Sequence, residues 1–212
     1  TAGQRDEAVK LVNDIAEALS AFYHGTKADP FWEMTAKQYL VATIVLMFRL
    51  CRQPEQINML SLASYTDTKS CQLLEQVADL LDENKDDNIM TMLRSVLSEP
   101  DKTKMSTLAT VNSMLTSFVT DEKLLRMLSN HSTFDIHDLY KRPIALFLIV
   151  PDEVETYTRI VGLLLQQISA ALVSDAYALG GALPRRVNFL CDEFCNYYVP
   201  GMARNISAHR SR

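Results

Sequence analysis

The sequence contains no segment of the form GxxxxGK[ST]. That glycine-rich loop is how P-loop proteins wrap backbone amides around nucleotide phosphates while a lysine reaches them. The only Lys-Ser and Lys-Thr pairs are Lys69-Ser70 and Lys102-Thr103, and neither pair directly follows a glycine. These 212 residues therefore cannot form a complete P-loop nucleotide site by themselves.

Cysteine is scarce, with four residues and no CxxC pair. Cys191 falls in an apolar run, where a small hydrophobic residue is expected. No histidine or further cysteine lies at a zinc-site spacing from Cys191 and Cys195. We therefore expect reduced, cytosolic cysteines and no metal site built from them.

Sets of residues typical of nucleophilic catalysis are also missing. No Ser/His/Asp or Cys/His arrangement stands out, so hydrolase and protease functions have no support. His24, His131 and His137 are isolated in turn-like sequence, and we expect solvated or locally bonded side chains. The sequence thus offers no histidine-based active site.

No apolar run reaches the roughly 18 residues that a membrane-spanning helix needs. The longest run, Tyr39 to Leu50, is shorter and contains Arg49, which predicts a buried core helix. No signal peptide opens the chain. The first residues, TAGQRDE, lack a methionine and are helix-like, which suggests a soluble fragment excised from a longer protein.

The balance of charge limits the classes of partner. With a formal net charge of -5, the surface as a whole is not suited to gripping nucleic acid. The last stretch is locally basic at Arg204, His209, Arg210 and Arg212. Any contact with DNA is therefore expected to be local.

Apolar residues recur at helical spacing from the start of the chain to about residue 128. Asp29 is a good N-cap with Pro30 at the first helical position, and Thr120 is a candidate cap near the end of this region. The periodicity predicts helices over residues 6–23, 29–51, 57–63, 73–81, 89–97, 105–118 and 124–128.

The C-terminal part has a different pattern. Two mainly apolar runs, residues 144–150 and residues 187–191 with Asn188 as its one polar member, flank an amphipathic stretch at 154–179 that Gly180 and Gly181 terminate. Such runs are typical of strands buried on both faces of a parallel sheet. The pattern predicts two adjacent parallel strands joined by a helix.

The second run ends at two adjacent acids, Asp192 and Glu193. Open α/β sheets place their chemistry at the carboxyl ends of strands. In P-loop NTPases an Asp at this position helps to hold Mg²⁺, and in many motor ATPases the following Glu polarises the attacking water. The alternative to such a catalytic pair is an edge strand that runs into an acidic turn. The motif alone does not distinguish the two, because an apolar run followed by Asp-Glu also occurs by chance.

Several segments in order resemble the conjugative coupling ATPases of type IV secretion, the TraG/TraD-like proteins. The similar segments are residues 142–152, residues 183–194 (LPRRVNFLCDEF) and residues 207–212 (SAHRSR). Asp29-Pro30-Phe31-Trp32, followed by Ala36 and an apolar helix, also resembles the start of that family's all-α domain. The similarity spans nearly the whole chain and lies in order and spacing.

The resemblance implies a mainly α fold, in which a helical-bundle all-α domain is inserted in a partial RecA-like α/β domain with a βαβ unit near the C-terminus. It implies a leading helix at 1–28, the all-α domain at 29–137, and a partial nucleotide-binding domain with Walker B at 138–212. The Walker A loop of that family lies upstream of the insertion, so we expect the fragment to be inactive alone.

The resemblance also implies roles for single residues. Asp192 would bind Mg²⁺ through water in the intact ATP site, Glu193 would orient the attacking water, and either Arg210 or Arg212 would act as an arginine finger on a neighbouring subunit. Cys195 replaces the family's usual Gly or Ala, and Tyr197-Tyr198 follows, which leaves the path of this loop open. ATP and Mg²⁺ are expected in the intact parent and neither in the fragment.

The implied parent is a homohexamer at the cytoplasmic side of the bacterial inner membrane, and the fragment by itself is expected to be monomeric. It would pump DNA and protein substrates into a conjugation channel, with a relaxase or another secretion substrate, DNA and the channel ATPases as partners. The alternative is that residues 29–137 form a helical recognition module that binds a relaxase or secretion substrate without catalysis of its own.

Overall fold

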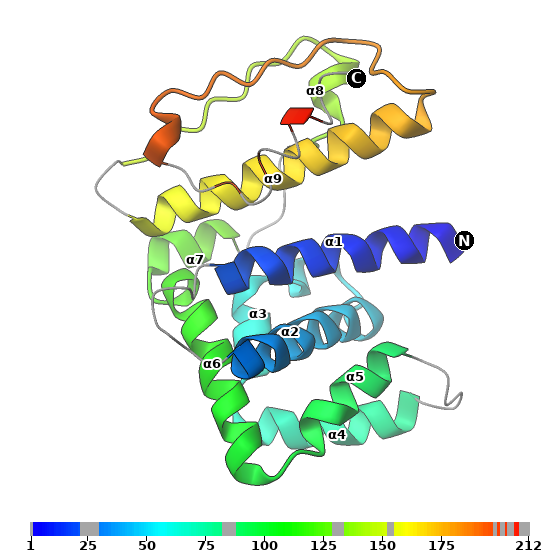
Figure 1. Cartoon of the computed structure of the whole chain (residues 1–212), viewed down its shortest axis with the longest axis vertical. Coiled ribbons are helices and arrows are strands. Elements are labelled where there is room, and N and C mark those ends of the chain that lie inside the picture. Colours follow the sequence, from blue (N-terminus) through cyan, green and yellow to red (C-terminus); the bar gives the residue numbers. More distant parts are fainter. Residues whose placement is uncertain are drawn as a thin grey trace. The chain divides into compact units, whose positions relative to one another are not determined.

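The computed structural model describes residues 2–21, 30–81, 88–128, 134–151 and 155–196, together with 199, 202 and 206–207. The chain forms two compact units, Thr1–His131 and Ser132–Arg212. Helices dominate the described residues, which contain no β-strand (Figure 1). The prediction of a mainly α protein is therefore confirmed.

All the elements that the structure describes in the first unit are helices. Its elements are α1 (Ala2–Ala21), α2 (Pro30–Leu50), the short 3-10 helix η1 (Pro54–Gln56), α3 (Met59–Ser64), α4 (Thr68–Leu81), α5 (Asn88–Leu97), α6 (Asp101–Val119) and α7 (Glu122–Leu128). Each helix that the apolar periodicity predicts in this part of the chain is present, with ends that shift by a few residues.

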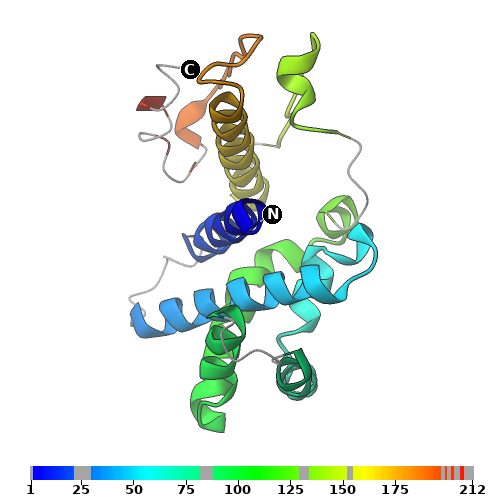
Figure 2. The same cartoon turned by 90° about the vertical axis from the view of Figure 1, so that its right-hand side faces the viewer.

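Helix α2 is the centre of this unit. It packs against α1, α5 and α6, and Figure 2 shows α2 and α6 crossing at a steep angle. The run from Tyr39 to Thr43 is completely buried, as are Leu46 and Met47 in the following turn. A helix that is apolar around its whole circumference must be covered on all sides, which explains its central position.

Short polar side chains begin the helices around α2. The Asn58 side chain accepts a hydrogen bond from the Ser61 amide at 2.9 Å, and Asp67 accepts one from the Lys69 amide at 2.8 Å. Before α7, Asp121 accepts hydrogen bonds from the amides of the two residues after Glu122, at 2.9 and 3.0 Å. The N-cap of α7 is therefore Asp121, and the predicted cap Thr120 is instead the C-cap of α6.

A buried hydroxyl links α2 to the turn between α3 and α4. The Tyr39 hydroxyl donates to the Tyr65 carbonyl at 2.5 Å and lies 3.4 Å from Cys71 Sγ. Burial raises the pKa of Tyr39 far above its usual value, and the nearby Cys71 raises it further. Burial likewise raises the pKa of the Cys71 thiol. Both groups are therefore kept protonated by the fold.

Tyr39→Phe should lower the free energy of unfolding of the helical unit by about 1–2 kcal/mol, because the part-buried Tyr65 carbonyl loses its hydroxyl donor and is left with the weaker Cys71 thiol at 3.8 Å. The ordinary tyrosine pKa is 10.0, so the unfolded chain releases this proton above about pH 10 while the folded chain keeps it. Wild-type stability should therefore fall as pH rises above that value. Urea unfolding at several alkaline pH values should show a shallower fall in Tyr39→Phe, and an unchanged slope would contradict this assignment.

The second unit contains α8 (Asp138–Lys141), α9 (Glu155–Ala178) and the 3-10 helix η2 (Phe194–Asn196). Its small core is formed by Tyr140 from α8 and by Ile168 and Leu172 from α9. Partly buried apolar residues of α9 itself and of the segments before and after it pack against this core, namely Ile136, Leu139, Leu164, Leu183 and Val187. Helix α9 thus organises the unit, as the predicted 154–179 helix implies.

The predicted βαβ unit is not supported. Residues 144–150 and 187–191 both run opposite to α9, but they are extended segments without strand pairing (Figure 1). Ile149 is 93% exposed and Leu190 is 95% exposed. Parallel strands are stable in sheets that are covered on both faces, whereas these two segments have a single long helix to pack against. The apolar pattern alone therefore does not produce a ladder in this chain.

One helix among the described residues, the Ile160–Ala178 part of α9, is long and apolar enough to cross a membrane. This rests on length and composition only, and the core helix of a soluble protein passes the same test. Residues 39–50 nevertheless form a longer apolar run in the sequence than any part of α9, because polar residues such as Gln166 and Gln167 interrupt α9.

Candidate functional site

The acidic pair lies in a turn that follows the extended segment 187–191. Asp192 and Glu193 are both exposed, and η2 begins at the next residue. The Asp192 carboxylate accepts a hydrogen bond from the Glu193 amide at 3.0 Å. Asn196 donates its backbone amide to the Glu193 carbonyl at 2.8 Å and its side-chain amide to the Glu193 carboxylate at 3.1 Å. Local hydrogen bonds thus define the position of both acids.

The backbone at Glu193 is unusual. Its φ angle is 49°, in the left-handed region that residues other than glycine seldom adopt. Strained backbone of this kind is often found at functional positions, and here it reorients the chain immediately after Asp192. A glycine would adopt this angle without strain, so the backbone by itself does not favour a glutamate here.

The structure brings only part of the predicted site together. Asp192 and Glu193 are neighbours, whereas Tyr197, Tyr198, Arg210 and Arg212 lie outside the described residues, as does the side chain of Cys195. Within the described part of the chain, no group of three or more His, Cys, Asp or Glu side chains is arranged to hold a metal ion. The chain also lacks a phosphate-wrapping loop. The residues present therefore do not fit a complete ATP and Mg²⁺ site.

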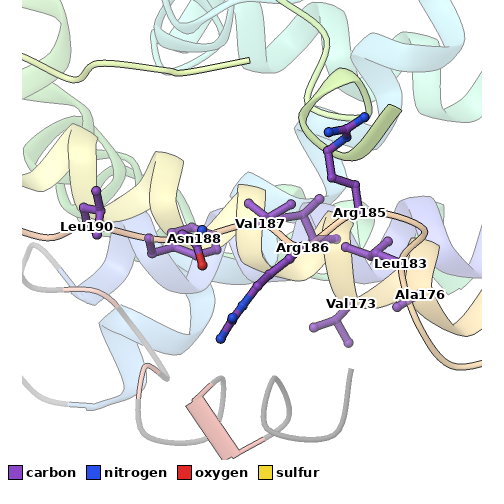
Figure 3. A pocket seen from close by; sticks show the side chains of 10 residues that line it. Val173, Ala176, Leu183, Arg185, Arg186, Val187, Asn188 and Leu190 are labelled. Atoms are coloured by element: carbon purple, nitrogen blue, oxygen red, sulfur yellow. The ribbon is translucent and has the colours of Figure 1, made fainter. Parts of the chain in front are cut away.

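A groove lies beside this turn, between α9 and the segment that precedes the acids (Figure 3). Its volume is about 650 Å³. Leu172, Val173 and Ala176 of α9 form one wall, and residues 185–190 form the other together with Leu183. Figure 3 shows Arg185 and Arg186 pointing to opposite sides of the extended chain. The sequence pattern does not predict this groove, although two arginines directly before an apolar run mark its position.

A second polar contact attaches the segment before α8 to α9. His137 Nδ1 lies 2.5 Å from the Asp175 carboxylate, and the His137 amide donates to Asp135 at 2.9 Å. The side chain of His137 is thus bonded to a residue far away in the sequence, which differs from the solvated or locally bonded side chain expected for it, and only its backbone amide is bonded locally. Burial raises the pKa of the neighbouring Tyr140, and the Asp175 carboxylate raises it further. These contacts fix one side of the unit that carries the groove.

A comparison with protein-family models gives one match, to a model described as type IV secretory system conjugative DNA transfer. The match covers residues 4–199, which include most of both units, the groove and the acidic pair. No curated protein and no solved structure matches the chain. The resemblance seen in the sequence is thereby confirmed, and the chain belongs to the type IV secretory system conjugative DNA transfer family.

Proposed function

We propose that the chain is part of a coupling ATPase that recruits DNA and protein substrates and pumps them into a conjugation channel. The observation that carries this proposal is the family match, which runs over residues 4–199. It is supported by the order of elements, in which a helical unit precedes a unit with a long helix and an exposed acidic pair. The working protein is a hexamer that contacts a relaxase, other secretion substrates, DNA and the channel ATPases.

In this proposal the chain contributes two acids to a nucleotide site, and the phosphate-wrapping loop is absent from these 212 residues. Asp192 supplies a carboxylate for Mg²⁺ through water, and Glu193 accepts a proton from water. Arg210 and Arg212 are the candidates for an arginine that stabilises charge in a neighbouring subunit. ATP and Mg²⁺ would bind the protein that combines this chain with the missing loop.

The location follows from the same family. A protein that feeds a conjugation channel works at the cytoplasmic side of the bacterial inner membrane, and we propose that location for the working protein. The proposal does not require α9 to span the membrane, because Ile168, Leu172 and Ala176 are buried within the second unit. These residues instead form its core.

The chain by itself should hydrolyse no ATP above the buffer blank, because no glycine-rich loop is available to hold the phosphates. A phosphate-release assay on the purified chain, and sequencing of the gene upstream of the codon for Thr1, test this directly. We expect a GxxxxGK[ST] segment upstream. Turnover that Asp192→Ala abolishes in the isolated chain would contradict the proposal, as would an upstream region without that loop.

A second candidate function is recognition of a protein partner by the helical unit. The observation that favours it is a pair of exposed leucines on α4, where Leu73 and Leu80 lie two turns apart. Leu60 on the neighbouring α3 is exposed as well. Exposed apolar side chains at helical spacing are typical of surfaces that bind partners. A relaxase or another secretion substrate would be the partner.

This candidate is tested by titrating the chain with a purified relaxase and with single- and double-stranded DNA at two salt concentrations. The double variant L73D/L80D should weaken binding of the protein partner, whereas DNA binding should be weak and lost at the higher salt. Circular dichroism of each sample would report whether the helical unit stays folded. If no partner binds while the helical signal is intact, recognition belongs to other parts of the working protein.

A further inference from the structure

The turn after Asp192 holds the carboxylate of Glu193 as well as its backbone. The Asn196 side-chain amide donates a hydrogen bond to Glu193 Oε2 at 3.1 Å, and the Asn196 backbone amide donates one to the Glu193 carbonyl at 2.8 Å. The backbone bond alone is the one that closes a 3-10 turn. The side-chain bond is therefore an additional constraint, and it acts on the carboxylate.

The two neighbouring acids are held by different donors. Asp192 accepts its hydrogen bond from the Glu193 backbone amide at 3.0 Å. Within the described part of the chain, the Asn196 amide is the one side-chain donor to the Glu193 carboxylate. An asparagine amide is neutral, so it orients a carboxylate without placing a positive charge beside it. Glu193 is thus fixed in position and keeps the negative charge that a base needs.

The side chain of Glu193 is constrained at both of its ends. The left-handed backbone, with φ 49°, sets the direction in which the side chain leaves the chain, and the Asn196 bond holds Oε2. The other oxygen, Oε1, has no partner among the residues that the structure describes. An exposed glutamate otherwise samples several rotamers, because three of its bonds rotate. The turn therefore presents Oε1 in a defined direction.

We infer that Asn196 is a positioning residue for the hydrolysis of ATP, in which it holds one oxygen of Glu193 so that the other faces the attacking water. The inference rests on the proposed function, in which Glu193 accepts a proton from that water. In this step the water oxygen bonds to the γ-phosphorus, its proton passes to Oε1, and the bond to the bridging oxygen breaks so that ADP leaves with the electron pair. Asn196 keeps its own protons and its bond to Oε2 throughout.

The test compares two substitutions of Asn196 in the longer ATPase proposed for this chain. Asn196→Ala should lower kcat at least about tenfold and change KM for ATP by no more than about twofold, because a misplaced base slows the chemical step without weakening nucleotide binding. Asn196→Asp has nearly the same shape but no amide donor, and its charge repels Glu193. It should lower kcat at least as far, whereas a residue needed only for its shape would tolerate aspartate.

A double variant shows whether Asn196 acts through Glu193. E193Q/N196A should hydrolyse ATP within about twofold of the rate of Glu193→Gln alone, because no base is left to position. Asn13→Asp is the matched control, since Asn13 is an exposed asparagine of α1 whose side-chain amide donates to the Val9 carbonyl at 2.8 Å. It should hydrolyse ATP at the parental rate. If Asn196→Ala misfolds by circular dichroism, Asn196→Asp decides the result.

The outcomes separate this inference from the proposed function. Parental kcat in both Asn196 variants, with hydrolysis lost in Glu193→Gln, would overturn the inference and leave the proposed function standing. Faster turnover in Asn196→Ala would also overturn it, since the bond would then restrain Glu193 instead of positioning it. Parental kcat in Glu193→Gln would overturn the proposed role of Glu193 and this inference together. A further loss in E193Q/N196A would show that Asn196 acts independently of Glu193, which contradicts the inference as well.

Discussion

Glu193→Gln, made in the longer ATPase proposed for this chain, should reduce ATP hydrolysis at least about a hundredfold. A glutamine keeps the size of the side chain and one acceptor oxygen, but its amide cannot take up a proton from water at neutral pH. The left-handed backbone at this position, with φ 49°, carries the same strain in both variants because both have the same Cβ. ATP binding should therefore change little while turnover is lost.

Steady-state phosphate release and equilibrium nucleotide binding separate the two effects, and DNA transfer from donor cells should fall in parallel with hydrolysis. Glu122→Gln is a matched control, since Glu122 is an exposed glutamate of α7 paired with Arg126 in the helical unit. It should hydrolyse ATP at the parental rate. Parental hydrolysis in Glu193→Gln would remove Glu193 from the chemistry, and equal loss in Glu122→Gln would point to a general defect.

Leu93→Ala should destabilise the helical unit by about 2–5 kcal/mol. Leu93 lies on α5, its side chain is 0% exposed, and α5 packs against the central helix α2. Removing its branched end deletes apolar contacts and leaves a cavity between helices that cannot fully close. A loss of this size is a large part of the stability of a typical domain, so partial unfolding near body temperature is expected.

The neighbouring helix provides a control, because Leu80 on α4 is 77% exposed. Leu80→Ala should change the free energy of unfolding by no more than about 0.5 kcal/mol. The only tryptophan, Trp32, lies on α2, so its fluorescence during urea unfolding reports on the helical unit alone. Similar shifts of the urea midpoint in the two variants would contradict the packing described for α5.

Apolar periodicity predicts the helical unit well because each of its helices carries its own signals. Asp67 caps α4 by accepting a hydrogen bond from the Lys69 amide, and Pro100 precedes the first residue of α6. Such contacts join residues that are close in the sequence, so they can be read from it. The buried position of Leu93 is equally local, since it follows from the 3.6-residue period of one helix.

The acidic pair and its groove are less predictable. Asp192 and Glu193 are visible as a motif, but the left-handed backbone of Glu193 has no signal in a sequence without glycine there. The groove wall at Val173 and the edge at Arg186 are separated along the chain by a turn, and only the path of that turn brings them together. The contact of His137 with Asp175 is long-range for the same reason.

The sequence by itself determined the helices and the family, because short-range periodicity and the order of segments can be read along the chain. Only the tertiary structure decided that residues 144–150 and 187–191 do not form strands. Strand formation depends on neighbours that cover both faces of a sheet, and an apolar run such as the one ending at Leu190 cannot supply its own. Tertiary packing likewise decided that this exposed edge, with Arg185 and Arg186 beside it, faces a groove instead of a sheet.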